Sequence, residues 1–538
     1  MATPSLLCLV ITIILGQCAT AAILSSKLIH RFSHEVKTLR VSKGMEELPH
    51  HWPSTRNLEY YRLLLDSDVH RQKMKLGPQY QLLFPSEGSK TMSFGNDLAW
   101  LHYTWVNIGT PSVSFLVALD TGTDLFWVPC NCVQCARLSA GYYTSLLDKD
   151  LNEYNPTGSS TSKVLNCSHQ LCEIDRSNCK SPKTCPYTVQ YFSEDTISSG
   201  VLVEDILHLD SDEDDSSNVS VKVPVIIGCG RKQSGGFLEG AAPDGLLGLG
   251  LGNISVPSLL YGSGMVRNSF SVCFNADNSG TIFFGDQGPS SQQITSFLPW
   301  DEKYLTYIVA VEDCCIGGSC LVKTDFKAVV DTGTSFTFLP QEMYEKVAKE
   351  FDEQINATAT SFGESPWKYC YKSSYEETPK IPKVTFKFAS NSSLVIRNPA
   401  FFIHDNEVLV GFCLAIQPAE LDKAIIGQNF LTGYRLVFDR ENLKLGWSLS
   451  DCKCVDCDDK NMPLNPKDGN PTPLPTNSEQ QSAPGGGRAT APVEAGKTPT
   501  KSSSSSASTT NPRRQYSWFS MMAMVMVLLL PLSLHLEN

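Results

Sequence analysis

The sequence predicts a mainly β protein made of two homologous lobes. The first observation is an internal repeat, in which residues 117–129 match residues 328–340 without gaps at an offset of 211 positions. Each copy contains a short apolar run, then Asp-Thr-Gly-Thr, then a second largely apolar run. This order is typical of a buried strand, a tight turn and another buried strand.

A second repeated element supports the duplication. Residues 244–248 (Asp-Gly-Leu-Leu-Gly) follow the first copy, and residues 423–427 (Lys-Ala-Ile-Ile-Gly) follow the second. The first half is longer, and its extra length fits a cysteine-rich insert over residues 130–185. We therefore expect β-rich lobes at residues 91–297 and 298–457, with the insert in the first lobe.

The repeat brings two aspartates together. Two equivalent lobes suggest a pseudo-twofold axis, at which Asp120 would meet its counterpart Asp331. Two carboxylates at close range cannot both ionise at low cost, so they share a proton and titrate as a pair. One can then act as general base on water while the other donates to a substrate carbonyl. A single Asp-Thr-Gly would indicate only a turn, but two copies inside a gapless repeat indicate a catalytic pair.

Composition limits the functional class. At 538 residues the chain exceeds one compact core, so we expect several domains and non-globular ends. The hydrophobic content of 41% and the charged content of 19% are ordinary for a folded protein. The net charge of −12, without basic stripes, argues against nucleic acid as a partner.

The amino terminus predicts secretion. Residues 6–15 form an apolar run too short to span a bilayer, and small residues follow it, so residues 1–21 are predicted to be a signal peptide. In an oxidising compartment the 17 cysteines beyond it should mainly form disulfides, with at least one thiol left free or paired with another chain. Two Cys-x-Cys-x-x-Cys clusters have no histidine nearby, so we predict no metal site.

Five sequons also fit a secreted chain. They lie at Asn166, Asn218, Asn253, Asn356 and Asn391. One sequon can occur by chance, but five behind a signal peptide predict glycosylation.

The carboxyl end predicts a lipid anchor. Residues 458–515 are rich in Pro, Ser and Thr, which indicates a flexible stalk, and residues 516–538 are hydrophobic. Small residues around Ser506, a polar spacer and the hydrophobic tail fit a glycosylphosphatidylinositol (GPI) signal, with Ser506 as the approximate attachment residue. The alternative is a transmembrane helix, but Arg513 and Arg514 precede the tail and no Lys or Arg follows it, against the positive-inside rule. We expect the protein at the outer face of the plasma membrane or in the cell wall space.

Over about residues 101–451 the chain resembles the pepsin family of aspartic endopeptidases, and in detail its plant branch with a cysteine-rich insert, the nepenthesin-like enzymes. The resemblance implies the bilobal pepsin-like fold and Asp120 and Asp331 as the catalytic pair. It implies hydrolysis of protein or peptide substrates with an acidic optimum and without a cofactor. We expect a monomer.

The resemblance also assigns supporting roles. The first threonine of each loop matches a hydroxyl that braces the two loops, and the second matches a residue that hydrogen-bonds the adjacent carboxylate. These loop residues are Thr121, Gly122, Thr123, Thr332, Gly333 and Thr334. Tyr191 matches the tyrosine of a hairpin flap over the substrate, and Trp127 matches its hydrogen-bond partner, although core packing is the commoner role for such residues. The resemblance further implies a Cys370–Cys413 disulfide.

Residues 22–90 precede the matched region and hold five of the ten histidines. They are either a solvated extension or, as the resemblance implies, an inhibitory pro-segment. The rival function for the whole chain is a non-catalytic inhibitor or wall-binding protein on the same fold. The intact Asp-Thr-Gly motifs favour the peptidase.

Overall fold

The computed structural model describes most of the chain between residues 22 and 452. The described residues are 22–34, 36, 53–54, 56–76, 100–135, 153–172, 179, 183–191, 196–211, 220–238, 241–275, 278–299, 306–322, 324–363, 365–376, 380–397, 399–419, 424–450 and 452. The chain divides into two units, Met1–Ala495 and Gly496–Asn538, and every described residue lies in the first. The predicted signal peptide, stalk, GPI signal and Asn218 lie outside the described residues.

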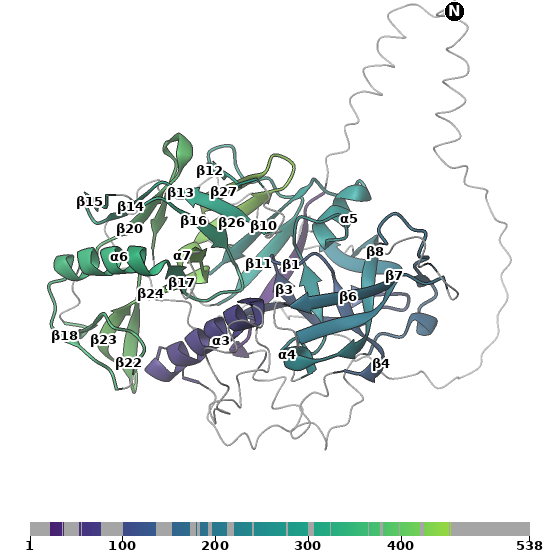
Figure 1. The fold of residues 1–538 in the computed structure, drawn as a ribbon, viewed down its shortest axis with the longest axis horizontal. Coiled ribbons are helices and arrows are strands. Elements are labelled where there is room, and N and C mark those ends of the chain that lie inside the picture. Colours follow the sequence, from purple (N-terminus) through teal and green to yellow (C-terminus); the bar gives the residue numbers. More distant parts are fainter. Residues whose placement is uncertain are drawn as a thin grey trace, which may run out of the picture. The chain divides into compact units, whose positions relative to one another are not determined.

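Strands dominate the first half, as the sequence predicts (Figure 1). Its strands are β1 (Leu24–His30), β2 (His102–Ile108), β3 (Val113–Asp120), β4 (Trp127–Gln134), β5 (Lys163–Val164), β6 (Pro186–Tyr191), β7 (Thr196–Ser211), β8 (Ser220–Gln233), β9 (Leu246–Gly248), β10 (Ser269–Phe274), β11 (Gly280–Phe284) and β12 (Gln293–Ser296). Its helices are α3 (Leu58–Leu76), α4 (Gly235–Leu238), α5 (Val256–Gly262) and the 3-10 turn η3 (Pro156–Gly158).

The second half has the same character. Its strands are β13 (Ile308–Val311), β14 (Asp313–Ile316), β15 (Ser319–Cys320), β16 (Phe326–Val330), β17 (Thr337–Leu339), β18 (Ala359–Thr360), β19 (Cys370–Lys372), β20 (Val384–Lys387), β21 (Ser393–Ile396), β22 (Ala400–Asp405), β23 (Val408–Leu414), β24 (Ile416–Pro418), β25 (Ala424–Ile426), β26 (Tyr434–Asp439) and β27 (Lys444–Leu449). Its helices are α6 (Gln341–Gln354), α7 (Gln428–Leu431) and the 3-10 turn η5 (Ala389–Asn391). The mainly β class and the two lobes are confirmed.

The internal repeat of the sequence becomes a repeat of strand pairing. In the first lobe β3 runs parallel to β9. β4 runs parallel to β8 and pairs antiparallel with β9 at Trp127. In the second lobe β16 runs parallel to β25. β17 runs parallel to β24 and pairs antiparallel with β25 at Phe338. Trp127 and Phe338 are matched positions of the sequence repeat, so the two lobes share one core design.

One large sheet joins the two halves of the sequence. Among the described residues it has 14 strands in the order β12-β27-β26-β10-β11-β1-β2-β3-β9-β4-β8-β7-β5, with β6 paired to β7. The carboxyl-terminal strand β26 thus lies beside β10, and β27 lies between β26 and β12. A Cys273–Cys452 disulfide links β10 to the residue that follows this hairpin by three positions. The expected boundary near residue 297 therefore lies between the two sequence repeats, but the large sheet contains strands from both sides of it.

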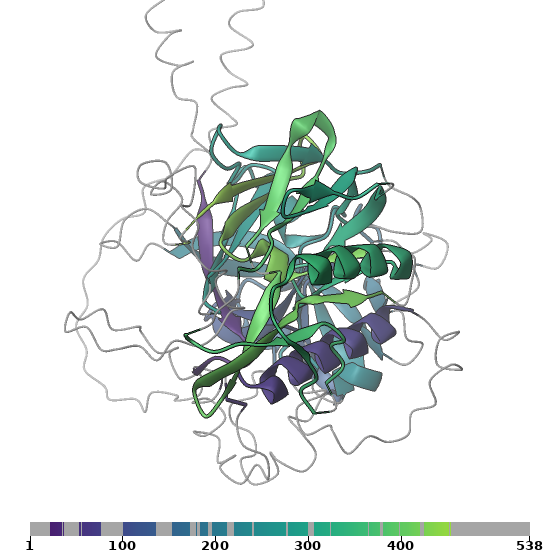
Figure 2. The same ribbon diagram turned by 90° about the vertical axis from the view of Figure 1, so that its left-hand side faces the viewer.

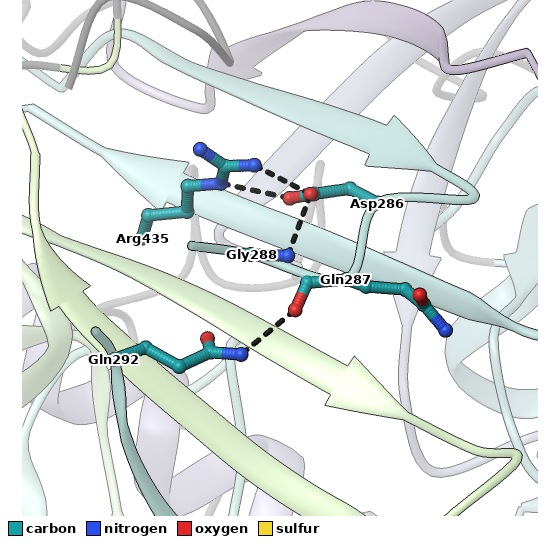
Figure 3. A network of polar contacts seen from close by, with 5 residues as sticks. All are labelled: Asp286, Gln287, Gly288, Gln292 and Arg435. Atoms are coloured by element: carbon teal, nitrogen blue, oxygen red, sulfur yellow. Dashed lines mark hydrogen bonds and ion pairs between the residues drawn. The ribbon is translucent and has the colours of Figure 1, made fainter. Parts of the chain in front are cut away.

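A buried ion pair fixes β26 against the first half (Figure 3). The Nε atom of Arg435 donates to Oδ2 of Asp286 at 2.8 Å, and Nη2 donates to Oδ1. The Gly288 amide also donates to Asp286 Oδ1, at 2.8 Å. Both charged side chains are 4% exposed or less. Separation of the pair would leave a buried charge without a partner, so the structure must keep this geometry. The pair fixes the position of β26 relative to the loop after β11.

The predicted pro-segment contributes to the core. The strand β1 lies between β11 and β2, and its Leu24 and Leu28 are buried in the main hydrophobic cluster. The helix α3 lies against the second lobe (Figure 2). The ring centroids of Tyr61 and Phe401 are 4.1 Å apart. Its Tyr60 is also fully buried. The described parts of this segment, β1 and α3, are therefore packed against the two lobes and do not form a solvated extension.

The end of β1 buries two histidines against each other. His30 pairs with His102 of β2, and their ring centroids are 5.3 Å apart. Burial lowers the pKa of His102 to about 3. Burial, the facing His102 and the adjacent Arg31 together hold the pKa of His30 well below its usual value. Both rings are therefore neutral at neutral pH.

Seven disulfides lie within the described residues, and the sequence analysis expects most cysteines to be paired. They are Cys130–Cys229, Cys132–Cys135, Cys167–Cys179, Cys172–Cys185, Cys273–Cys452, Cys315–Cys320 and Cys370–Cys413. Among the described cysteines Cys314 has no disulfide partner, and burial raises the pKa of its thiol to about 12. The thiol is therefore protonated and shielded, which makes it a poor nucleophile.

A substitution at Gly248 tests how closely β9 packs against the backbone of Asp124. A Cβ atom there would lie 2.2 Å from the carbonyl oxygen of Asp124, so alanine must push backbone aside. We expect Gly248→Ala to lower the free energy of unfolding by about 1–3 kcal/mol. Gly262→Ala is the control, because nothing lies within 4 Å of a Cβ at that position. Thermal denaturation of both variants measures the difference, and equal midpoints would contradict the crowding.

The histidine pair predicts a pH dependence of stability. Unfolding returns His102 to its ordinary pKa of 6.5, so between pH 6.5 and about 3 the unfolded chain binds more protons than the folded chain. The free energy of unfolding therefore falls with decreasing pH, by up to about 1.4 kcal/mol per pH unit for this group. We expect His102→Phe to flatten the decline in thermal midpoint between pH 6.5 and 4, and to leave the profile above pH 7 unchanged. An unaltered acid slope would rule out this assignment.

Candidate active site

Asp120 lies at the carboxyl end of β3, opposite Gly248 of β9. Its side chain is 2% exposed. The Gly122 amide donates to Oδ1 at 2.7 Å, whereas Oδ2 has no hydrogen-bond partner among the described residues. The Asp-Thr-Gly turn thus folds back on its own carboxylate and leaves one oxygen for another partner.

Asp331 occupies the matching place directly after β16 and is 4% exposed. The Gly333 amide donates to its Oδ1 at 2.9 Å, as Gly122 does in the first lobe. The Thr334 hydroxyl donates to Oδ2 at 3.0 Å, which is the contact that the family resemblance implies. The two aspartates therefore have the same glycine-amide contact, and Asp331 has a threonine hydroxyl donor in addition.

Tyr307 connects the two aspartate-bearing segments. Its carbonyl accepts a hydrogen bond from Val330, the residue before Asp331, at 2.9 Å. Its hydroxyl donates to the carbonyl of Leu249 at 2.7 Å, and the Leu249 amide donates to the carbonyl of Asp120 at 2.9 Å. Burial raises the pKa of Tyr307, which keeps this hydroxyl a donor. One fully buried residue is thus bonded to the segments that carry both aspartates.

Arg440 fixes the same segment of the first lobe. From the end of β26 its Nη2 atom donates to the Gly250 carbonyl at 3.0 Å, and also to Ser255 and Ser258 at 3.1 and 2.7 Å. Asp124 accepts from the Gly252 amide at 2.7 Å. Sequence reasoning missed Tyr307 and Arg440, because neither belongs to a repeated motif. Asp124 is part of the Asp-Thr-Gly-Thr-Asp sequence, but nothing in the sequence indicates that it accepts a hydrogen bond from Gly252.

The other predicted loop residues lie where the repeat places them. Thr121 and Thr332 are buried, at 2% and 4% exposure. Thr123 is half-buried, and its carbonyl accepts from the Gly250 amide at 2.8 Å. Their assigned roles remain predictions.

The predicted flap is a hairpin of β6 and β7, in which Tyr191 pairs with Thr196. The side chain of Tyr191 and the hairpin tip at residues 192–195 lie outside the described residues. Trp127 is fully buried and packs edge-on against Phe237 at 4.8 Å. Its Nε1 atom has no partner in the part of the chain that the structure describes. Core packing is therefore the role of Trp127 that the structure displays.

The remaining predicted sites lie at the surface or in a disulfide. Cys370 and Cys413 form the bridge that the resemblance implies, between β19 and β23. Four of the sequon asparagines are described, and all four are exposed: Asn166, Asn253, Asn356 and Asn391. Within the described residues, no group of His, Cys, Asp and Glu side chains is arranged to hold a metal ion.

Comparison with known proteins places this geometry in a family. Residues 102–286 match the family model described as xylanase inhibitor N-terminal, and residues 309–449 match xylanase inhibitor C-terminal. Among solved structures, basic 7S globulin from soybean aligns with a TM-score of 0.50 at 19% identity, covering 66% of this chain and 95% of that chain. At this identity the likeness concerns the fold alone.

Sequence relatives are more informative. Aspartic proteinase-like protein 1 of Arabidopsis thaliana is 55% identical over 489 residues, which cover 89% of this chain and 90% of the relative. Aspartyl protease family protein 1 of Arabidopsis thaliana is 41% identical over 443 residues, covering 81% and 83%. Nepenthesin-1 of Nepenthes gracilis is a distant relative at 26% identity over 440 residues, covering 78% of this chain and 92% of the relative. The chain therefore belongs to the plant aspartic proteinase-like family.

Proposed function

We propose that this chain is an aspartic endopeptidase that hydrolyses protein or peptide substrates with Asp120 and Asp331. The observation that carries the proposal is the matched pair of Asp-Thr-Gly loops. In each loop the glycine amide holds one carboxylate oxygen, at 2.7 Å for Asp120 and 2.9 Å for Asp331. Hydrogen bonds through Tyr307 join the segments that bear them.

The proposed chemistry needs two carboxyl groups in different protonation states. A pair that shares one proton provides a base, which removes a proton from water, and an acid, which donates to the carbonyl oxygen of the scissile peptide. The amides of Gly122 and Gly333 orient the two carboxyl groups, and burial of both side chains excludes bulk water from their far sides. No cofactor is needed for this reaction.

A non-catalytic inhibitor or wall-binding protein is the second candidate. The description of the matching family models as xylanase inhibitor domains favours it. Two features favour the peptidase instead: neither Asp-Thr-Gly motif is altered, and Thr334 hydrogen-bonds Asp331. An inhibitor has no need for both.

Replacement of either aspartate distinguishes the two candidates. We expect Asp120→Asn and Asp331→Asn each to lower turnover of a denatured protein substrate by about 100- to 10,000-fold, because each loses a carboxyl group but keeps its shape. Wild-type activity should be highest in acid, between the two apparent pKa values of the pair. Asp313→Asn is the matched control, since Asp313 is exposed on β14. Full activity in either catalytic variant, with circular dichroism unchanged, would refute the assignment.

We further propose that the protein is secreted and attached to the membrane by a GPI anchor near Ser506. The order of stalk, small residues, spacer and hydrophobic tail supports this proposal. In the described part of the chain, no helix has the length and apolarity of a membrane span.

Enzymatic release tests the anchor. Phosphatidylinositol-specific phospholipase C should transfer the protein from washed membranes to the supernatant, because the proposed anchor is a phosphatidylinositol. Peptides from residues 518–538 should be missing from the mature protein by mass spectrometry. The control is a chain truncated after Lys460, which should be secreted in soluble form without lipase. Retention after lipase treatment, together with recovery of those peptides, would instead establish a transmembrane helix.

A further inference from the structure

The helix α3 places a carboxylate next to the loop of Asp331. Asp68 is 2% exposed, and its oxygens accept hydrogen bonds from the Ser335 amide at 2.8 and 2.9 Å and from the Phe336 amide at 2.9 Å. The Ser335 hydroxyl donates to the same carboxylate at 3.0 Å. Ser335 directly follows Thr334, which holds Asp331. The contact therefore begins one residue beyond the catalytic loop.

These donors are arranged to hold an anion. Two consecutive backbone amides that point at one spot form a concave anion-binding site, and hydrogen bonds to a carboxylate are stronger than neutral ones. No substitution other than proline removes a backbone amide donor, and both donors need another acceptor whenever Asp68 leaves. The arrangement thus selects a carboxylate over an apolar side chain.

The matched positions of the first lobe have different chemistry. At the repeat offset of 211, Ser335 corresponds to Asp124 and Phe336 to Leu125. Asp124 supplies its own carboxylate, which accepts from the Gly252 amide at 2.7 Å. A second carboxylate would be repelled there. The carboxylate-binding site is therefore a difference between the lobes, not a general feature of the duplicated loop.

An apolar surface lies beside the site. Tyr61, Leu64 and Leu65 of α3 pack into one cluster with Phe336 and Phe401 of the second lobe. Spacings of three and four residues put Tyr61, Leu64 and Asp68 on one face of the helix. The helix therefore contacts the second lobe through an apolar face and, on the same face, the acidic side chain of Asp68.

We propose that Ser335 and Phe336 form a carboxylate-binding subsite next to the catalytic loop, which the full chain fills with its own Asp68. Once α3 leaves, a protein segment that offers Asp or Glu beside aromatic or leucine side chains binds there. Resting on the proposed peptidase function, this gives the enzyme a preference for an acidic substrate residue at a fixed distance from the cleaved bond.

Hydrogen exchange in the full chain tests the subsite without any need for activity. Asp68→Ala should speed exchange of the Ser335 and Phe336 amides by about ten- to a hundredfold, because each loses a charge-assisted hydrogen bond. Asp68→Asn keeps one neutral acceptor and should give an intermediate rate. Asp66→Ala is the matched control, because Asp66 lies on the same helix but is exposed. Exchange rates in Asp68→Ala equal to those in Asp66→Ala would overturn the subsite.

Cleavage of a peptide library by the acid-treated full chain tests the preference. We expect Asp and Glu to be enriched several-fold at one position relative to the cut, and Ser335→Ala to reduce that enrichment by removing one donor. Active enzyme without any acidic enrichment would overturn the specificity. Absence of cleavage by the wild-type chain would contradict the proposed function instead, and hydrogen exchange would still decide whether Asp68 fills a carboxylate site.

Discussion

The arrangement of the candidate site depends on the hydrogen bonds of Tyr307. Its backbone is bonded to the residue before Asp331, and its hydroxyl is bonded to Leu249, which in turn holds the backbone of Asp120. A shared-proton pair requires that two carboxylates from distant parts of the sequence keep a fixed relation. A buried tyrosine has few rotameric states and one polar atom, so it can set that relation with little freedom. Arg440 adds a second constraint on the same segment.

The two lobes are alike in backbone and different in chemistry. Their strands pair in the same pattern, and their glycines hold the two aspartates in the same way. One position after the matched threonines, however, the first lobe carries an acceptor in Asp124 and the second a donor in Ser335. A duplicated fold can therefore keep a symmetric pair of aspartate loops while the surroundings become asymmetric. A peptide also has a direction, so the asymmetry is compatible with the proposed substrate.

The sequence predicted the features that depend on local pattern. Strand, turn and strand around each Asp followed from apolar runs and Asp-Thr-Gly, and the pairing of the lobes followed from the repeat. It could not predict contacts between residues far apart, such as Asp68 with Ser335, because no periodicity links positions 267 residues apart. Trp127 shows another limit: an aromatic residue in a buried strand has the same sequence pattern whether its indole nitrogen is bonded or only packed.

The position of β1 has a consequence for biosynthesis. It is the first described strand of the chain, yet it lies inside the large sheet, where Leu24 pairs with Phe284 of β11, 260 positions later. Contacts so distant along the sequence are slow to form, and a chain made from its amino end exposes early segments before their partners exist. The apolar side chains Leu24 and Leu28 of β1 therefore lack their β11 neighbours until more than half of the polypeptide has been synthesised. The pairing of β1 with β11 can form only after β11 has been synthesised, so the sheet does not assemble strand by strand from the amino terminus.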